Sequence, residues 1–180
     1  GVPNESQEAW VFHDLPKHNT KNEKEEEIAD KLFMLLCEEL IEYIGKSSSV
    51  GVLLSGGMDS RMVAGCLNHI IKERKVHVER VVAYTWGSKN SRDVVYAQRI
   101  ANELGWEFKT FIVGANELWN NFMIAGVRGC EYSGLHLHAM PQIAESNDVE
   151  LILAGSYGDS VGRAEYSGKR VDKLIPIHKK

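Results

Sequence analysis

The sequence has no long hydrophobic run and no excess of basic residues. No apolar stretch approaches the roughly 18 residues that a membrane-spanning helix needs, and the N-terminal GVPNESQEAW lacks the basic and apolar regions of a signal peptide. Lys and Arg total 21 against 25 Asp and Glu, a formal net charge of −4, which argues against a nucleic-acid partner. These absences predict a cytoplasmic protein that makes no membrane contact.

Cysteine is scarce, and its spacing excludes two common kinds of site. Cys37, Cys66 and Cys130 are far apart and lack the CxxC spacing of a zinc ribbon. An odd number of scattered cysteines also argues against a disulfide framework, so we expect all three to be small buried hydrophobic residues. His136 and His138 would point to different faces of a helix and form a poor metal cluster with Cys130, which favours a polar surface role for both.

Length and composition predict a single domain. The chain has 180 residues, 43% hydrophobic and 26% charged, enough for one full core and too few for two ordinary domains. Residues 1–22 contain two prolines and an isolated apolar group, and we interpret them as an irregular lead-in to a domain at residues 23–180. Because the sequence starts at Gly1 rather than methionine and ends in HKK, we expect a piece of a longer chain or a processed product.

Helices and strands are predicted to alternate along this domain. Apolar residues at spacings of three and four indicate helices, and short apolar runs indicate buried strands. Pro141 would bend or start its helix. The predicted helices are 23–45, 60–75, 91–104, 117–125 and 135–146, and the predicted strands are 50–54, 78–86, 106–113 and 149–155.

This alternation predicts a doubly wound α/β domain with a mostly parallel sheet and helices on both faces. In the common spatial order 3-2-1-4, the winding reverses between strands 1 and 4, and ligands bind outside the carboxyl ends of the strands there. We therefore expect the loop after Leu54 to face the loop after Gly155.

The loop after the first strand reads SGGMDS, residues 55–60. Glycines without Cβ atoms let an anion approach the backbone amides, and the following helix N-terminus adds partial positive charge. A plain glycine-containing turn is the alternative, but this pattern would arise by chance only about once in several thousand chains of this length. The loop has no lysine and is therefore not the G-x-x-x-x-G-K-[ST] phosphate loop.

In these residues the sequence resembles the PP-loop ATP pyrophosphatases, whose SGGxDS loop holds the pyrophosphate part of ATP. LLSGGMDS, with its apolar Met58, is similar to the asparagine synthetase group, which includes β-lactam synthetase-like enzymes. AYTWG, SRDVVYAQRIANELGWEF and LILAGSYGD resemble that group's second strand, Tyr-Ala helix and second Gly-rich acidic loop, so the resemblance covers about residues 50–162. It implies an adenine nucleotide alpha hydrolase-like fold with strand order 3-2-1-4-5, in which all or part of the fifth strand lies beyond residue 180.

The resemblance also implies site residues for ATP and Mg²⁺. Two acidic residues, Asp59 and Asp159, would bind Mg²⁺, which fits because facing carboxylates repel each other unless a cation lies between them. A turn-forming role is the alternative for Asp159 taken alone. The implied nucleotide contacts are Leu54 and Trp86 around adenine, the backbone of Ala154 and Gly155 beneath the nucleotide, and Ser55, Gly56, Gly57 and Ser60 around pyrophosphate, with Asp59 reaching it through the metal.

Two departures from the family pattern leave the identity of the carboxylate substrate open. Ser160 stands in place of the usual Glu, and VGRAEY follows in place of an aromatic-Gly-Gly-Tyr run. Arg61 stands where Ser or Thr is usual. The family's catalytic lysine is expected beyond residue 180, and its glutaminase domain, with an N-terminal cysteine nucleophile, is expected outside this chain.

The function implied by the resemblance is that of an ATP-dependent amide-forming ligase domain. A small carboxylate would attack the α-phosphate and release pyrophosphate, and ammonia or an amine would then displace AMP. A glutaminase domain or subunit would supply the ammonia. Two alternatives stay open: another PP-loop enzyme that acts on RNA or on a different carboxylate, and a nucleotide-binding module without catalysis.

Overall fold

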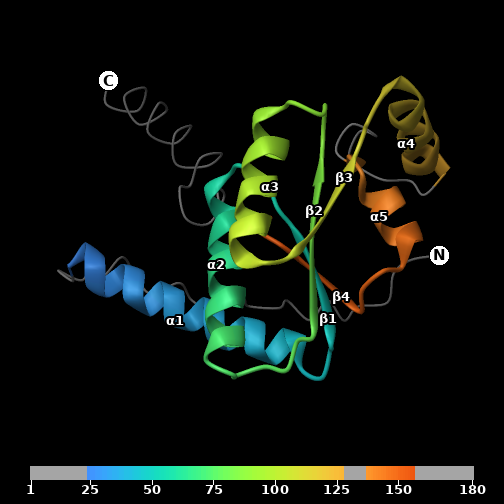
Figure 1. The fold of residues 1–180 in the computed structure, drawn as a ribbon. Coiled ribbons are helices and arrows are strands. Elements are labelled where there is room, and N and C mark those ends of the chain that lie inside the picture. The colour runs from blue at the N-terminus through green and yellow to red at the C-terminus, as the bar shows by residue number, and fades with distance from the viewer. Residues whose placement is uncertain (1–23, 128–136, 157–180) are drawn as a thin grey trace, which may run out of the picture.

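The four strands of the domain form one parallel sheet in the order β3-β2-β1-β4. The structure is a computed structural model, and it describes residues 24–127 and 137–156. The elements in chain order are α1 (Glu25–Ile44), β1 (Ser49–Leu53), α2 (Met58–Lys72), β2 (Arg80–Trp86), α3 (Arg92–Leu104), β3 (Glu107–Phe111), α4 (Ala115–Val127), α5 (Met140–Ser146) and β4 (Leu151–Ala154) (Figure 1). The predicted α/β class and strand order are confirmed.

Local signals in the sequence account for several helix ends. Acidic residues fill the first turn of α1, where the helix dipole favours them. The Ser91 hydroxyl accepts a hydrogen bond from the Val94 amide and caps α3, which ends at Gly105 in the left-handed conformation. Pro141 lies in the first turn of α5, where its missing N–H costs nothing, so this helix starts at Met140 and is shorter than predicted.

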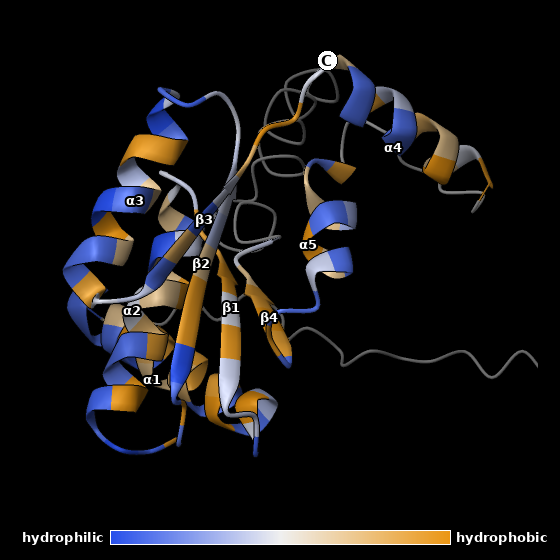
Figure 2. Cartoon of the chain, turned by 45° about the vertical axis from the view of Figure 1, so that its right-hand side comes forward, coloured by the Kyte–Doolittle hydropathy of each residue, from blue (hydrophilic) through white to orange (hydrophobic). Residues whose placement is uncertain are grey.

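The helices cover the two faces of the sheet unequally. Figure 2 shows α1, α2 and α3 on one side of the sheet and α5 with α4 on the other. Val50 and Val52 of β1 point toward α2 and are fully buried, whereas Val82 and Tyr84 of β2 point toward α5. Helices therefore lie on both faces, as predicted. No helix in the described ranges is both long and apolar enough to cross a bilayer.

Two of the cysteines are core residues, as predicted. Cys37 of α1 and Cys66 of α2 belong to the same buried cluster. Burial, reinforced by the neighbouring Cys37 thiol, raises the pKa of Cys66 to about 12, so this thiol stays protonated at neutral pH and behaves as a small apolar group. Cys130 lies outside the described residues, as do residues 1–22.

Gly51, in the middle of the central strand, is required by the packing of a tyrosine. The ring of Tyr84, on the neighbouring strand, lies over it: a Cβ at Gly51 would be 2.6 Å from Tyr84 Cε2 and 3.1 Å from Val149 Cγ2. Tyr84 is fully buried and cannot swing into solvent. A glycine usually weakens a strand interior, and here it makes room for the largest fully buried side chain of the described residues.

Charged side chains join β2, β3 and the segment before β4. The Arg80 Nε and Nη2 atoms each donate to a carboxylate oxygen of Glu107 at 2.7 Å, and Arg80 Nη1 donates to the Asp148 carbonyl oxygen at 2.6 Å. The Lys109 ammonium forms an ion pair with the Asp148 carboxylate. Hydrogen bonding from Lys109 lowers the pKa of Asp148 below its ordinary value, and Arg80 likewise lowers the pKa of Glu107.

We expect Gly51→Ala to lower the free energy of unfolding by about 1–3 kcal/mol, because the buried Tyr84 ring must move to admit the methyl group. Gly65→Ala is the matched control, since a Cβ added at Gly65, in α2, would meet nothing within 4 Å. It should raise the free energy of unfolding by roughly 0.5–1 kcal/mol. Urea unfolding monitored by circular dichroism measures both, and equal effects of the two substitutions would contradict this account.

We also expect Asp148→Asn to lower the free energy of unfolding at pH 6. The folded-state pKa of Asp148 is depressed, so its stabilising contribution is present above the unfolded-state pKa of about 4 and is lost as the pH falls through the lower folded-state value. The difference between wild type and variant should therefore shrink below about pH 4. Urea titrations from about pH 6 to 2.5 test this, with exposed Glu38→Gln as control; a constant difference would contradict it.

Candidate functional site

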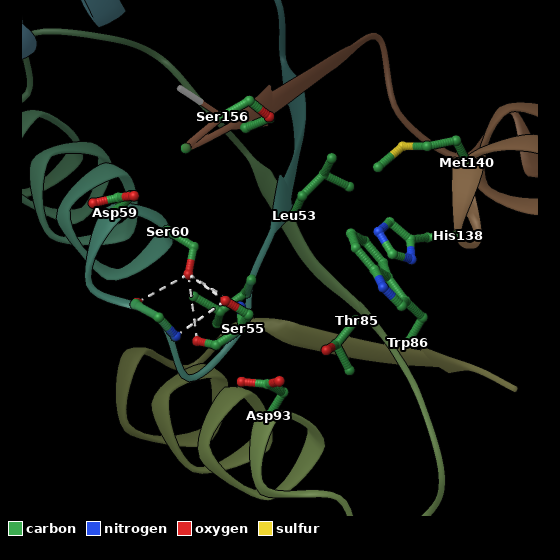
Figure 3. A pocket seen from close by; sticks show the side chains of 14 residues that line it. Leu53, Ser55, Asp59, Ser60, Thr85, Trp86, Asp93, His138, Met140 and Ser156 are labelled. Atoms are coloured by element: carbon green, nitrogen blue, oxygen red, sulfur yellow. Dashed lines mark hydrogen bonds between the residues drawn. The ribbon is translucent and has the colours of Figure 1, made fainter. Parts of the chain in front are cut away.

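A cavity of about 530 Å³ opens at the carboxyl ends of β1, β2 and β4. Its volume lies within the range of about 300–1,000 Å³ that is usual for small-molecule sites. Figure 3 shows the loop after β1 and the start of α2 on one side, and Trp86 with the residues before α5 on the other. The lining residues are Leu53, Leu54, Ser55, Gly57, Asp59, Ser60, Thr85, Trp86, Asp93, His138, Met140, Ala154, Gly155 and Ser156.

The loop after β1 is held in shape largely by its own two serines. The Ser60 side chain is largely buried, and its Oγ accepts a hydrogen bond from the Ser55 amide at 3.1 Å and lies 3.0 Å from Ser55 Oγ. The Ser55 Oγ accepts from the Gly57 amide at 3.0 Å. These short-range bonds close the turn between β1 and α2, as the dashed lines in Figure 3 show.

The first turn of α2 supplies the donors that a phosphate would need. The N–H groups of a helix's first turn have no acceptor within the helix, and the helix dipole makes this end partly positive. In α2 these groups belong to Met58, Asp59 and Ser60, directly after the loop. Asp59 and Ser60 both line the cavity. The arrangement therefore provides an anion-binding helix N-terminus at the cavity wall.

The loop after β4 packs directly on this turn. A Cβ atom at Gly155 would lie 2.7 Å from both the Asp59 carbonyl carbon and the Ser60 amide nitrogen. Only a residue without a side chain permits such an approach of two backbones. Gly155 itself therefore meets the start of α2, whereas residues 157 onward of the loop that was expected to face the loop after Leu54 lie outside the described residues.

The opposite wall comes from β2 and the residues before α5. The imidazole of His138 stacks on the indole of Trp86, with 5.2 Å between ring centroids and 18° between planes. The His138 carbonyl oxygen accepts a 2.8 Å hydrogen bond from Asn121 Nδ2 of α4, and Asn121 is only 1% exposed. His138 is exposed, as expected of a polar surface residue. Its place at the cavity wall was not predicted, because that place depends on how α4 and α5 pack against the sheet and not on its spacing from His136.

Most of the predicted nucleotide residues line the cavity, and Gly56 is the exception. Its amide faces α3, where Asp93 Oδ1 accepts its hydrogen bond at 2.9 Å. Arg61 is exposed and donates from Nε to the Gly57 carbonyl oxygen at 3.2 Å. Asp159 and Ser160 lie outside the described residues, and so does His136. The binding roles predicted for the nucleotide residues and for Asp159 stay predictions.

Sequence reasoning missed several lining residues, among them Thr85, Asp93, His138 and Met140. Thr85 and Asp93 could have been suspected, because each lies at or just after the carboxyl end of β2, at the same sheet edge as the glycine-rich loop. His138 and Met140 carried no such signal. Within residues 24–127 and 137–156, no group of three or more His, Cys, Asp or Glu side chains could hold a metal ion.

Comparison with known proteins identifies relatives of this chain. Residues 45–163, more than half of the chain, match the family model described as Asparagine synthase. "Putative asparagine synthetase (glutamine-hydrolyzing) 1" of Methanocaldococcus jannaschii is 22% identical over 157 residues, which cover 83% of this chain and 27% of that protein. The asparagine synthetase of Bos taurus is 34% identical over 68 residues, 38% of this chain and 12% of that protein.

Among solved structures, the U34-tRNA thiolase NcsA from Methanococcus maripaludis aligns with a TM-score of 0.48 and 18% identity, over 85% of this chain and 54% of that one. The chain spans about a quarter of the length of the first of the curated relatives and less of the bovine one.

We expect Gly155→Ala to lower the free energy of unfolding by about 1–3 kcal/mol, because the added methyl group meets backbone atoms that have no alternative rotamer. Gly126→Ala, in α4, is the control: a Cβ added there would meet nothing within 4 Å, so it should not destabilise the fold. Urea unfolding compares the two. A Gly155→Ala protein as stable as wild type would show that the two loops do not pack as closely as described.

Proposed function

The chain belongs to the asparagine synthase family, and we propose that it is the ATP-binding domain of an amide-forming ligase that cleaves ATP to AMP and pyrophosphate. One observation carries this proposal. The SGGMDS loop and the first turn of α2 form one wall of a cavity at the carboxyl end of the central strand, opposite an aromatic side chain. Such a site offers amides to a triphosphate and an apolar surface to a base.

Different residues of the cavity would contact the phosphates and the adenine of ATP. The N-terminus of α2 would bind the phosphates through backbone amides and the helix dipole. Leu54 and Trp86 would contact adenine, and the backbone at Ala154 and Gly155 would lie beneath the nucleotide. Because Gly155 touches the Asp59 and Ser60 backbone, the phosphate end and the nucleotide floor belong to one rigid surface.

Among the described residues, Asp59 would supply one carboxylate to a magnesium ion that is shared with phosphate. Mg²⁺ binds proteins through one or two carboxylates together with substrate phosphates. The Asp59 carboxylate borders the cavity at the N-terminus of α2, and Asp159 would be the second ligand. When bound, the ion would neutralise charge on the phosphates.

The proposed reaction begins with attack of a small carboxylate on the α-phosphate of ATP. The bond between the α- and β-phosphates breaks, pyrophosphate leaves, and an acyl adenylate remains. Ammonia or an amine then attacks the acyl carbon, and AMP leaves. The part of this chain is to hold the reactants in line and to stabilise charge on the leaving pyrophosphate with fixed dipoles.

The source of nitrogen belongs to the larger protein that we propose. A glutaminase domain or subunit would supply ammonia, and a lysine beyond residue 180 would stabilise the transition state of adenylation. The proposal does not name the acceptor carboxylate. Its pocket would include the wall formed by His138 and Met140, which face the loop across the cavity.

We expect Asp59→Asn to weaken binding of Mg-ATP roughly tenfold or more, because it removes one of the few carboxylates available to the metal. Isothermal titration with Mg-ATP measures the effect. Asp30→Asn, an exposed acid-to-amide change on α1, is the matched control and should bind as wild type does. Unchanged affinity of the Asp59→Asn protein would overturn the metal assignment.

Isotope exchange between ATP and pyrophosphate, measured on this chain and on a chain that includes its flanking domains, tests the chemistry separately. Exchange that depends on an added carboxylate supports the adenylating ligase. Binding of Mg-ATP without exchange, in the longer chain as well, would instead identify a nucleotide-binding module without catalysis.

A further inference from the structure

The first turn of α3 reaches across to the glycine-rich loop. Asp93 lies in this turn, and its Oδ1 accepts a 2.9 Å hydrogen bond from the Gly56 amide. The other hydrogen-bonded amides of the loop, those of Ser55 and Gly57, donate to serine side chains of the loop itself. Arg61 of α2 also bonds the loop, through the Gly57 carbonyl oxygen. Within the described residues, Asp93 is thus the side chain outside the loop that bonds one of the loop's amides.

The contact is close, and the element that carries it is rigid. A Cβ at Gly56 would lie 2.9 Å from Asp93 Oδ1 and 3.6 Å from Tyr96 Cβ, so α3 packs closely against the loop and a side chain at Gly56 would displace the Asp93 carboxylate. Val94 and Ala97 of α3 are buried. Asp93 is therefore fixed by a helix that is capped at Ser91 and packed on β2.

A carboxylate at this place carries an electrostatic cost. Asp93 borders the cavity, where its negative charge repels the phosphates of a nucleotide. A plain polar residue would avoid that repulsion. The carboxylate also accepts the hydrogen bond from the Gly56 amide. A charged acceptor holds an amide more strongly than a neutral one, and this stronger bond offsets the repulsion.

We propose that Asp93 is a positioning residue: it fixes Gly56 so that the loop keeps the shape in which the first-turn amides of α2 face the cavity. This inference rests on the proposed function for the identity of the ligand, which is taken to be a pyrophosphate group. Asp93 itself would not touch the ligand. Three loop amides, those of Ser55, Gly56 and Gly57, are then used for the shape of the loop, and the amides of Met58, Asp59 and Ser60 are left for the phosphates.

The decisive comparison is between Asp93→Ala and Asp93→Asn. An asparagine keeps an oxygen that can accept from the Gly56 amide, whereas an alanine does not. For magnesium pyrophosphate, titrated by calorimetry into the 180-residue chain, we expect binding about five- to tenfold weaker in Asp93→Ala and within about twofold of wild type in Asp93→Asn. Glu103→Ala, an exposed acid at the other end of α3, controls for the loss of charge and should bind as wild type does.

Hydrogen exchange of the Gly56 amide tests the bond without any nucleotide. By NMR, this amide should exchange about tenfold faster in Asp93→Ala than in wild type. In Asp93→Asn, whose neutral oxygen accepts a weaker bond, it should exchange at an intermediate rate. If Asp93→Ala does not fold, wild type still provides a test, because its Gly56 amide must exchange more slowly than that of Met58.

Wild-type binding or exchange in Asp93→Ala would overturn the proposal, as would an Asp93→Asn protein as weak as Asp93→Ala. Failure of the wild-type chain to bind Mg-ATP or magnesium pyrophosphate would count against the proposed function instead. In that case the exchange result would still decide the role of Asp93 in shaping the loop.

Discussion

The central position of β1 is the constraint on which the site depends. β1 pairs in parallel with β2 on one side and β4 on the other, so Leu53 lies between Tyr84 and Ala154. The carboxyl ends of three strands therefore meet at one edge of the sheet, and the chain leaves them toward different helices. At this edge the glycine-rich loop, Trp86 and Gly155 surround one cavity. Without this pairing, residues separated by a hundred positions would not share a site.

The loop itself shows how a short sequence can serve both shape and binding. Ser60 is largely buried, and its hydroxyl bonds within the loop rather than pointing into the cavity, although its backbone amide belongs to the first turn of α2. Gly56 gives room to α3, and Gly155, directly after β4, gives room to the first turn of α2. The specified residues of SGGMDS are thus explained largely by packing and by internal hydrogen bonds. In the proposed site, the backbone that these residues position would contact the anion.

The fold could be predicted from the sequence where local signals and the rules of topology agree. The four strands, their order and the helix ends at Ser91 and Gly105 follow from apolar periodicity, capping residues and the rules for parallel sheets. The nucleotide residues followed from the resemblance, and the strand order brought them together. His138 could not be found in this way, because the side chain of Asn121, seventeen residues earlier in the chain, bonds its carbonyl oxygen and the sheet supplies Trp86. Asp93 belongs to a predicted helix, but its partner Gly56 lies 37 positions away, and spacing alone does not reveal such a pair.

The two walls of the cavity are formed by different segments of the chain. One wall consists of the loop after β1 and the end of β4, which rest on the central sheet and on each other through backbone contact. The other includes His138 and Met140, which come from the connection between β3 and β4. There Asn121 of α4 bonds the His138 carbonyl oxygen, and Ile143 of α5 packs against the sheet. A change in that connection alters the second wall without moving the first, because no hydrogen bond of the loop within the described residues involves it. Under the proposed function, phosphate binding and the choice of acceptor would therefore vary independently, since they would draw on different parts of the chain.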